Sequence, residues 1–291
     1  MASFSVCCGN KACDANCRCC ISKITCACDC NDIGSPDKDF NWDKLQWAID
    51  YIKVRQVPSA LITGRGEPCL HQKHLLDIAA ELRQRKLHVE VQTNGKALST
   101  WSYDSINELK RYCGNVAISV FSLDPRENNE IMRFNNGSYD ICRLVNYLNA
   151  FGITVRLVYM LYFENHKSSY QEKKDSAWFL SRIKIARNMG VKQITFRSVG
   201  IPESENQCPQ IEWAESHGDR NDYTHIIRNI ANKRLWDMSW GGQVYDVDGM
   251  SVCIESGPEG CLTERVEKPR SFIFDGQNLR YSWQYEGAII F

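Results

Sequence analysis

The chain has 291 residues, 43% of them hydrophobic, and its 35 Lys and Arg residues balance its 35 Asp and Glu residues. A chain of this length can bury one sizeable core, and its charge balance argues against a polynucleotide or an anionic membrane as partner. No apolar stretch reaches the roughly 20 residues of a membrane span, and the first residues lack the pattern of a signal peptide. We therefore expect a cytoplasmic protein with one main domain.

Strand-like and helix-like segments alternate along most of the chain. Short apolar or alternating runs predict strands over 2–9, 58–64, 88–95, 115–124, 153–161 and 191–200. Apolar residues at helical spacing predict helices over 41–52, 75–87, 102–114, 139–152, 176–190 and 221–234. Six strand-to-helix units of this kind are typical of a parallel sheet whose crossover connections are helices.

The predicted fold is therefore α/β, with a partial (βα)6 parallel barrel in residues 1–235. Residues 236–291 contain short β-type runs separated by turn pairs such as Asp248-Gly249, which predict a small C-terminal antiparallel β appendage that caps the barrel. Reacting residues of parallel barrels lie at the carboxyl ends of the strands. Because the glycine-rich and polar stretches of this sequence follow the predicted strands, we expect the functional site at that edge.

The cysteines are concentrated near the start of the chain, where nine of the 15 fall within the first 30 residues. A long chain with an odd number of cysteines and no export signal favours reduced, metal-binding thiols over a disulfide scaffold. Cys13, Cys17 and Cys20 have C-x3-C-x2-C spacing and supply three thiolates on one loop. A zinc knuckle would need a fourth ligand, whereas a [4Fe–4S] cluster with three protein ligands keeps one iron open for a small molecule.

A second motif follows the second predicted strand and consists of Thr63, Gly64, Arg65, Gly66, Glu67 and Pro68. Together, the cysteine loop and this turn resemble the radical S-adenosylmethionine (SAM) superfamily, over about residues 3–235. The resemblance implies that the three cysteines hold a [4Fe–4S] cluster, that its open iron binds SAM, and that the turn holds the SAM ammonium group. It also implies that an electron from an external donor such as flavodoxin or ferredoxin splits SAM, and that the resulting 5′-deoxyadenosyl radical takes a hydrogen atom from the substrate.

The resemblance implies further contacts with SAM at later strand ends, namely Thr93, Asn94, Ser119, Ser122 and Arg197, the last of which could bind the substrate instead. The turn itself departs from the family pattern, because Arg65 stands where the family has its second glycine. A non-glycine residue adopts positive φ only at a cost. We therefore expect the turn to differ at Arg65, or Gly66 to take the strain.

Four cysteines outside the first motif are candidates for a second cluster, and they are Cys26, Cys28, Cys30 and Cys208. The density of Cys26, Cys28 and Cys30 close to the first loop favours ligation, with Cys208 as a distant further ligand. The alternative is a set of idle thiols, because the tail lacks the ordered cysteine spacing of extensions that carry auxiliary clusters. The sequence leaves both interpretations open.

The most specific functional prediction concerns the tail residues Cys253 and Cys261. A thiol S–H bond is weak enough to return a hydrogen atom to a substrate radical, and similar radical SAM epimerases use a cysteine in this way. The alternative is that both residues are structural cysteines without a catalytic role. We expect a radical SAM oxidoreductase or isomerase that acts on a small or natural-product substrate, with epimerisation of a sugar or aminosugar as the specific hypothesis. The alternatives are a radical dehydrogenase, a peptide- or RNA-modifying enzyme, and a non-catalytic cysteine-rich metal-binding protein.

Overall fold

The computed structural model describes residues 3–26, 40–163, 174–199, 208–238, 242–255, 271–282 and 287–291. In these ranges the strands are β1 (Ser3–Cys7), β2 (Ser59–Thr63), β3 (His88–Thr93), β4 (Asn115–Val120), β5 (Thr154–Leu161), β6 (Gln193–Ser198), β7 (Lys233–Asp237), β8 (Gln243–Val247), β9 (Met250–Glu255), β10 (Ser271–Phe274) and β11 (Leu279–Arg280). The α-helices are α1 (Ile21–Cys26), α3 (Trp42–Val54), α4 (Gln72–Gln84), α5 (Tyr103–Tyr112), α6 (Pro125–Met132), α7 (Ile141–Ala150), α8 (Ser176–Asn188), α9 (Pro209–His217) and α10 (Thr224–Ile230). Short 3-10 helices lie at η1 (Pro68–Leu70) and η2 (Leu98–Thr100). None of the helices in the described ranges is long and apolar enough to cross a membrane.

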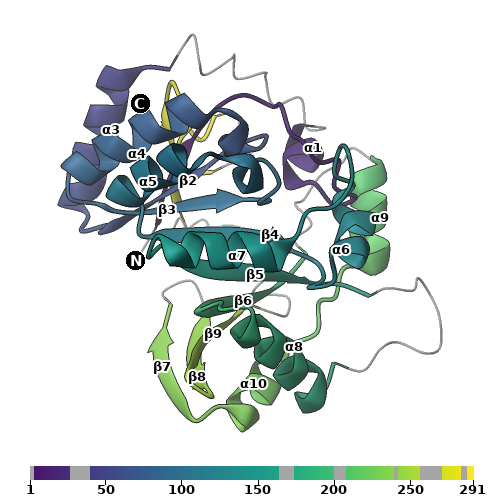
Figure 1. Ribbon diagram of the computed structural model, residues 1–291. Coiled ribbons are helices and arrows are strands. Elements are labelled where there is room, and N and C mark those ends of the chain that lie inside the picture. The colour runs from purple at the N-terminus through teal and green to yellow at the C-terminus, as the bar shows by residue number, and fades with distance from the viewer. Residues whose placement is uncertain are drawn as a thin grey trace.

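The described strands form one sheet in the order β11-β10-β1-β2-β3-β4-β5-β6-β9-β8-β7. Strands β1 to β6 run parallel to their neighbours, as the six predicted strand-to-helix units require. Figure 1 shows α4 and α5 beside β2 and β3, α7 over β4 and β5, and α8 beside β6. The predicted parallel α/β architecture is confirmed. Within the described residues the sheet is open, because no pairing joins β11 to β7.

The tail strands extend both edges of this same sheet. Antiparallel pairing is confirmed for β7 with β8, β8 with β9, and β10 with β11. However, β9 pairs parallel with β6, and β10 pairs parallel with β1. The six-stranded core would otherwise present two rows of unpaired backbone groups, and the tail covers both of them. The division of the chain into a barrel and a separate appendage stays a prediction.

The predicted turn at Asp248-Gly249 is confirmed, and the predicted helix before it is partly wrong. Asp248 and Gly249 have φ angles of 51° and 78° and join β8 to β9, the geometry of a two-residue hairpin turn. The helix expected over 221–234 spans only Thr224–Ile230, and Lys233–Asp237 forms β7. Backbone pairing with β8 therefore overrides the local helical preference of the last residues.

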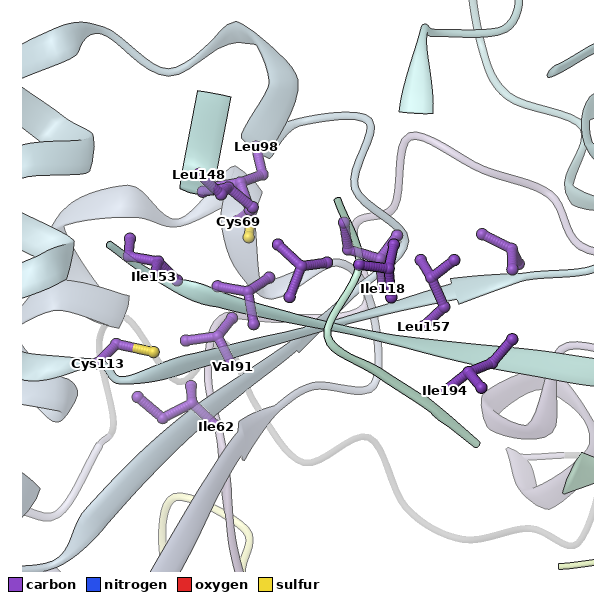
Figure 2. Close-up of a cluster of buried hydrophobic side chains, with 14 of the residues drawn as sticks. Ile62, Cys69, Val91, Leu98, Cys113, Ile118, Leu148, Ile153, Leu157 and Ile194 are labelled. Atoms are coloured by element: carbon purple, nitrogen blue, oxygen red, sulfur yellow. The ribbon is translucent and has the colours of Figure 1, made fainter. Parts of the chain in front are cut away.

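The face of the sheet that the helices cover is apolar. Each of the strands β2 to β6 contributes a buried residue to it, namely Ile62, Val91, Ile118, Leu157 and Ile194, each at most 1% exposed. Figure 2 shows these residues, with Leu148 of α7 and Leu98 beside them. Because side chains alternate between the two faces of a strand, the residues between these positions point to the opposite face.

That opposite face, which we call the inner face, bears most of the polar and charged side chains of these strands. Its members include Ser5 of β1, Glu90 of β3, Ser119 of β4, Arg156 of β5, Thr195 and Arg197 of β6, and Cys253 and Glu255 of β9. Glu90 and Thr195 are only 6% and 5% exposed. Arg156 forms a salt bridge with Glu90 across β4, where the small residue Ala117 leaves room for it. The fold therefore keeps hydrogen-bonding and charged groups on one side of the sheet and packs its core on the other.

Phe196 on the helix-covered face provides a test of this packing. Its ring is fully buried and lies 4.9 Å from the Phe179 ring of α8 and 5.7 Å from the Tyr159 ring of β5. Phe196→Ala is expected to lower the free energy of unfolding by about 3–5 kcal/mol, because it leaves a cavity at this junction. Leu235→Ala, at a 46% exposed position of β7, is expected to cost about 0.5 kcal/mol or less. Urea denaturation compares the two variants, and equal losses would contradict the packing argument.

Candidate functional site

The loops that follow β1, β2 and β3 meet at the carboxyl edge of the sheet. The loop after β1 carries Cys13, Cys17 and Cys20, and we call residues 8–20 the cysteine loop. The loop after β2 begins at Gly64 and leads into η1. Because these strands are parallel neighbours, residues that are distant in the sequence become adjacent at this edge.

Two glycines let the turn after β2 lie directly against the cysteine loop. A Cβ atom added to Gly66 would lie 2.0 Å from the carbonyl oxygen of Ala12, and one added to Gly64 would lie 2.8 Å from the carbonyl oxygen of Cys8. The Glu67 N–H also donates a hydrogen bond to the Ala12 carbonyl, at 2.9 Å. Backbone therefore packs on backbone here, with no room for a side chain.

The expected strain in this turn is absent. Neither Arg65 nor Gly66 has a positive φ angle. Gly64 and Gly66 are needed for the close approach to the cysteine loop, and not for a left-handed conformation. Arg65 lies between the two contact points and is partly exposed, so the turn accommodates its side chain.

The Glu67 carboxylate joins the turn to the end of β3. The side chain is 3% exposed and accepts hydrogen bonds from the Cys69 N–H at 2.9 Å, from the Thr93 hydroxyl at 2.6 Å and from the Asn94 N–H at 2.8 Å. Burial raises the pKa of Glu67 above its usual value, and these three donors act in the opposite direction because they stabilise the charged form. The predicted site residues Glu67, Thr93 and Asn94 therefore form one hydrogen-bonded unit.

The cysteine loop is held from its other side by the segment at the end of α6. Ala15 forms an isolated antiparallel bridge with Phe134, and the Arg18 N–H donates to the Ile131 carbonyl at 3.0 Å. The Cys17 sulfur lies 3.6 Å from the Met132 sulfur. Sequence patterns did not indicate these contacts, because they are mostly made by the backbone and carry no signature in residue types.

The three thiols fit the predicted [4Fe–4S] cluster. They are free, and Cys13 is exposed while Cys17 and Cys20 are partly exposed. Burial raises the pKa of Cys13 to about 11 and that of Cys17 well above its usual range. Among the described residues, no three His, Cys, Asp or Glu side chains meet closely enough for a single metal ion. Three thiolates can supply the protein ligands of a cluster, in which each binds a different iron, whereas a structural zinc site needs a fourth ligand.

Cys253 lies on the inner face, in a polar surrounding. It pairs in register with Thr195 of β6, and the next pair along on this face is Arg197 with Glu255. The Arg197 Nε atom lies 3.4 Å from Glu255 Oε2. Burial, together with the Glu255 charge, raises the pKa of the Cys253 thiol to about 12, so this thiol stays protonated at neutral pH.

The remaining predicted site residues divide into four groups. Ser119 lies on the inner face, where it pairs with Val158. The Ser122 hydroxyl donates to Glu127 at 2.6 Å and accepts from the Asp124 N–H, so it serves a local turn. Cys208 directly precedes α9 and is partly exposed. The described part of the structure does not include Cys28, Cys30, Cys261 or the Cys26 side chain. The second cluster therefore stays a prediction.

Comparison with known proteins identifies the family. A model of the radical SAM superfamily matches residues 10–169, which is more than half of the chain. The chain therefore belongs to the radical SAM superfamily, a family of enzymes that use a [4Fe–4S] cluster and SAM. No curated protein sequence matches it significantly.

Solved structures provide a second comparison, and one of them, SuiB, shares the fold. SuiB from Streptococcus suis is similar with a TM-score of 0.55 and 15% identity, over 98% of this chain and 61% of SuiB. Its SAM-bound structure has a TM-score of 0.47 and 18% identity, over 70% of this chain and 41% of SuiB. Coproporphyrinogen III oxidase (HemN) from Escherichia coli has a TM-score of 0.42 and 10% identity, over 85% of this chain and 64% of HemN. The chain thus spans less than two thirds of each of these proteins.

The close approach at Gly66 provides a test of the site. Gly66→Ala is expected to destabilise the fold by about 1–3 kcal/mol and to reduce iron binding, because the new methyl group displaces the cysteine loop. Gly287→Ala is the matched control, since a Cβ atom there would meet nothing within 4 Å. Thermal unfolding and iron content after anaerobic reconstitution measure both effects. Equal iron content in the two variants would contradict the proposed contact.

Proposed function

We propose that this protein is a radical SAM epimerase that inverts one carbon of a small polar substrate such as a sugar or an aminosugar. The observation that carries the proposal is the arrangement of the sheet. At its carboxyl edge the Glu67 N–H binds the Ala12 carbonyl and joins the Gly64–Pro68 turn to the cysteine loop, and its inner face bears the buried thiol of Cys253 among polar and charged side chains. When bound, the cluster and SAM supply hydrogen-atom abstraction from an unactivated carbon.

The roles of the residues at the carboxyl edge follow from their contacts. Cys13, Cys17 and Cys20 hold the cluster, because their loop is fixed between the turn after β2 and the end of α6. Glu67 fixes the turn that receives the amino end of SAM, since its carboxylate is saturated by donors from two loops. The polar groups of the inner face then offer binding groups for the substrate, among them Arg197, whose side chain is 42% exposed.

Cys253 completes the reaction in this proposal. Its S–H bond breaks as a new C–H bond forms on the opposite face of the substrate carbon, and the resulting thiyl radical then takes one electron from a flavodoxin- or ferredoxin-type donor and one proton from water. Each turnover therefore consumes one SAM and two electrons. A thiol, and not a thiolate, is needed as hydrogen donor, and the buried position of Cys253 keeps it in that form. A radical dehydrogenase would need no such donor, and the two reactions differ in their products.

The cluster assignment predicts the behaviour of a ligand variant. The triple variant Cys13→Ala, Cys17→Ala, Cys20→Ala is expected to lose formation of 5′-deoxyadenosine from SAM under a strong reductant. Glu67→Gln is the matched comparison, because its amide group turns a donor toward backbone N–H groups and loosens the turn without removing a ligand. This variant should keep the cluster spectrum and cleave SAM more slowly. Continued 5′-deoxyadenosine formation by the triple variant would show that other residues hold the cluster.

The hydrogen-donor role predicts a solvent isotope effect on the product. In deuterated water with the true substrate, the wild-type protein should place deuterium at the inverted carbon. Cys253→Ala should form 5′-deoxyadenosine but no inverted product. Cys113→Ala is the control, since Cys113 is buried beside the helix-covered face at the opposite end of β4 and should not affect the label (Figure 2). Normal inversion by Cys253→Ala would rule out this role, and an oxidised product would favour dehydrogenation.

A further inference from the structure

Asn94 connects the turn after β2 to the cysteine loop through two different groups. Its backbone N–H donates to Glu67 Oε2 at 2.8 Å. Its side-chain Nδ2 atom donates to Asp14 Oδ1 at 2.7 Å and lies 3.7 Å from the Cys13 sulfur. The residue is 8% exposed, so water competes little for these contacts.

The orientation of the Asn94 amide is fixed by its neighbours. The Lys96 N–H donates to Asn94 Oδ1 at 2.8 Å, and a backbone N–H is a donor only. The oxygen must therefore face Lys96, and the NH2 group must face the cysteine loop. The Tyr139 hydroxyl donates to the Asn94 carbonyl oxygen at 2.8 Å and fixes the backbone as well. These hydrogen bonds therefore fix the direction of the Asn94 N–H group toward the Cys13 sulfur.

This placement has a consequence for a cluster bound at Cys13. Reduction adds negative charge to a cluster, and a hydrogen-bond donor at a ligand sulfur stabilises that charge, which raises the reduction potential. The Asp14 carboxylate beside the same sulfur acts in the opposite sense, since a like charge disfavours reduction. The Asn94 amide contacts both the Cys13 sulfur and the Asp14 carboxylate, so this one side chain affects both influences on the reduction potential.

We propose that the Asn94 side chain is a positioning residue for the cluster, which holds Cys13 and Asp14 and raises the reduction potential, in place of the SAM contact that the sequence alone predicts. The inference rests on the proposed ligation of the cluster by Cys13. It also explains why an asparagine serves here, because the position needs an acceptor for Lys96 and a donor for the loop in one planar group.

Reduction potentials of two variants test the proposal. Asn94→Ala removes the donor and is expected to lower the midpoint potential of the cluster, whereas Asp14→Asn removes the neighbouring charge and is expected to raise it. Potentiometric titration followed by electron paramagnetic resonance, without SAM, measures both in reconstituted protein, with iron and sulfide content as the check on loading. Asn146→Ala is the matched control, since the Asn146 amide lies 3.5 Å from the sulfur of exposed Cys142, outside the site, and should leave the potential unchanged.

A second measurement covers the case in which Asn94→Ala loads poorly. In the wild-type protein, proton double-resonance spectra of the reduced cluster should show an exchangeable proton that disappears in deuterated water, and the Asn94→Ala variant should lack it. Equal midpoints for wild type and Asn94→Ala at full loading, or no exchangeable proton attributable to this residue, would overturn the inference alone. Absence of any cluster from the wild-type protein would overturn the proposed function, and the inference with it.

Discussion

The carboxylate of Glu67 is the interaction on which the site depends. A charged group that is 3% exposed is costly to bury unless it is fully hydrogen-bonded, and three donors from two loops satisfy this one. The N–H of the same residue binds Ala12 in a third loop. The geometry of the carboxyl edge is therefore set by the requirement to solvate one buried charge, and a loop that moved away would leave that charge unsatisfied.

Backbone contacts also hold the cysteine loop in place beside the Glu67 carboxylate. Gly64 and Gly66 allow two loops to touch without intervening side chains, and the end of α6 holds the cysteine loop from the other side. Backbone atoms have little conformational freedom in such an arrangement, so the three cysteines are presented from a loop that is braced along both flanks. A loop prepared in this way loses less entropy when a cluster binds than a free loop would.

The register of β9 decides the chemistry of the inner face. Because side chains alternate along a strand, a shift of one residue against β6 would turn Cys253 toward the helices and bring Val252 to the inner face. The apolar partners on the helix-covered face oppose such a shift, since Val252 and Ile254 are at most 2% exposed there. Core packing on one face thus fixes the position of the thiol on the other.

The sequence by itself determined the six strand-to-helix units, the Asp248-Gly249 turn and the two motifs, because these depend on local spacing and on residue type. Arg65, by contrast, was expected to distort its turn, and the structure shows that the glycines serve close approach instead. The two roles of Asn94, the bracing of Cys17 by the end of α6, and the insertion of β9 beside β6 were decided by tertiary structure alone. Each joins residues that are far apart in the chain, and apart from the Asn94 amide and the Cys17 sulfur they do so through backbone groups common to all residues. Such contacts leave no pattern in a single sequence.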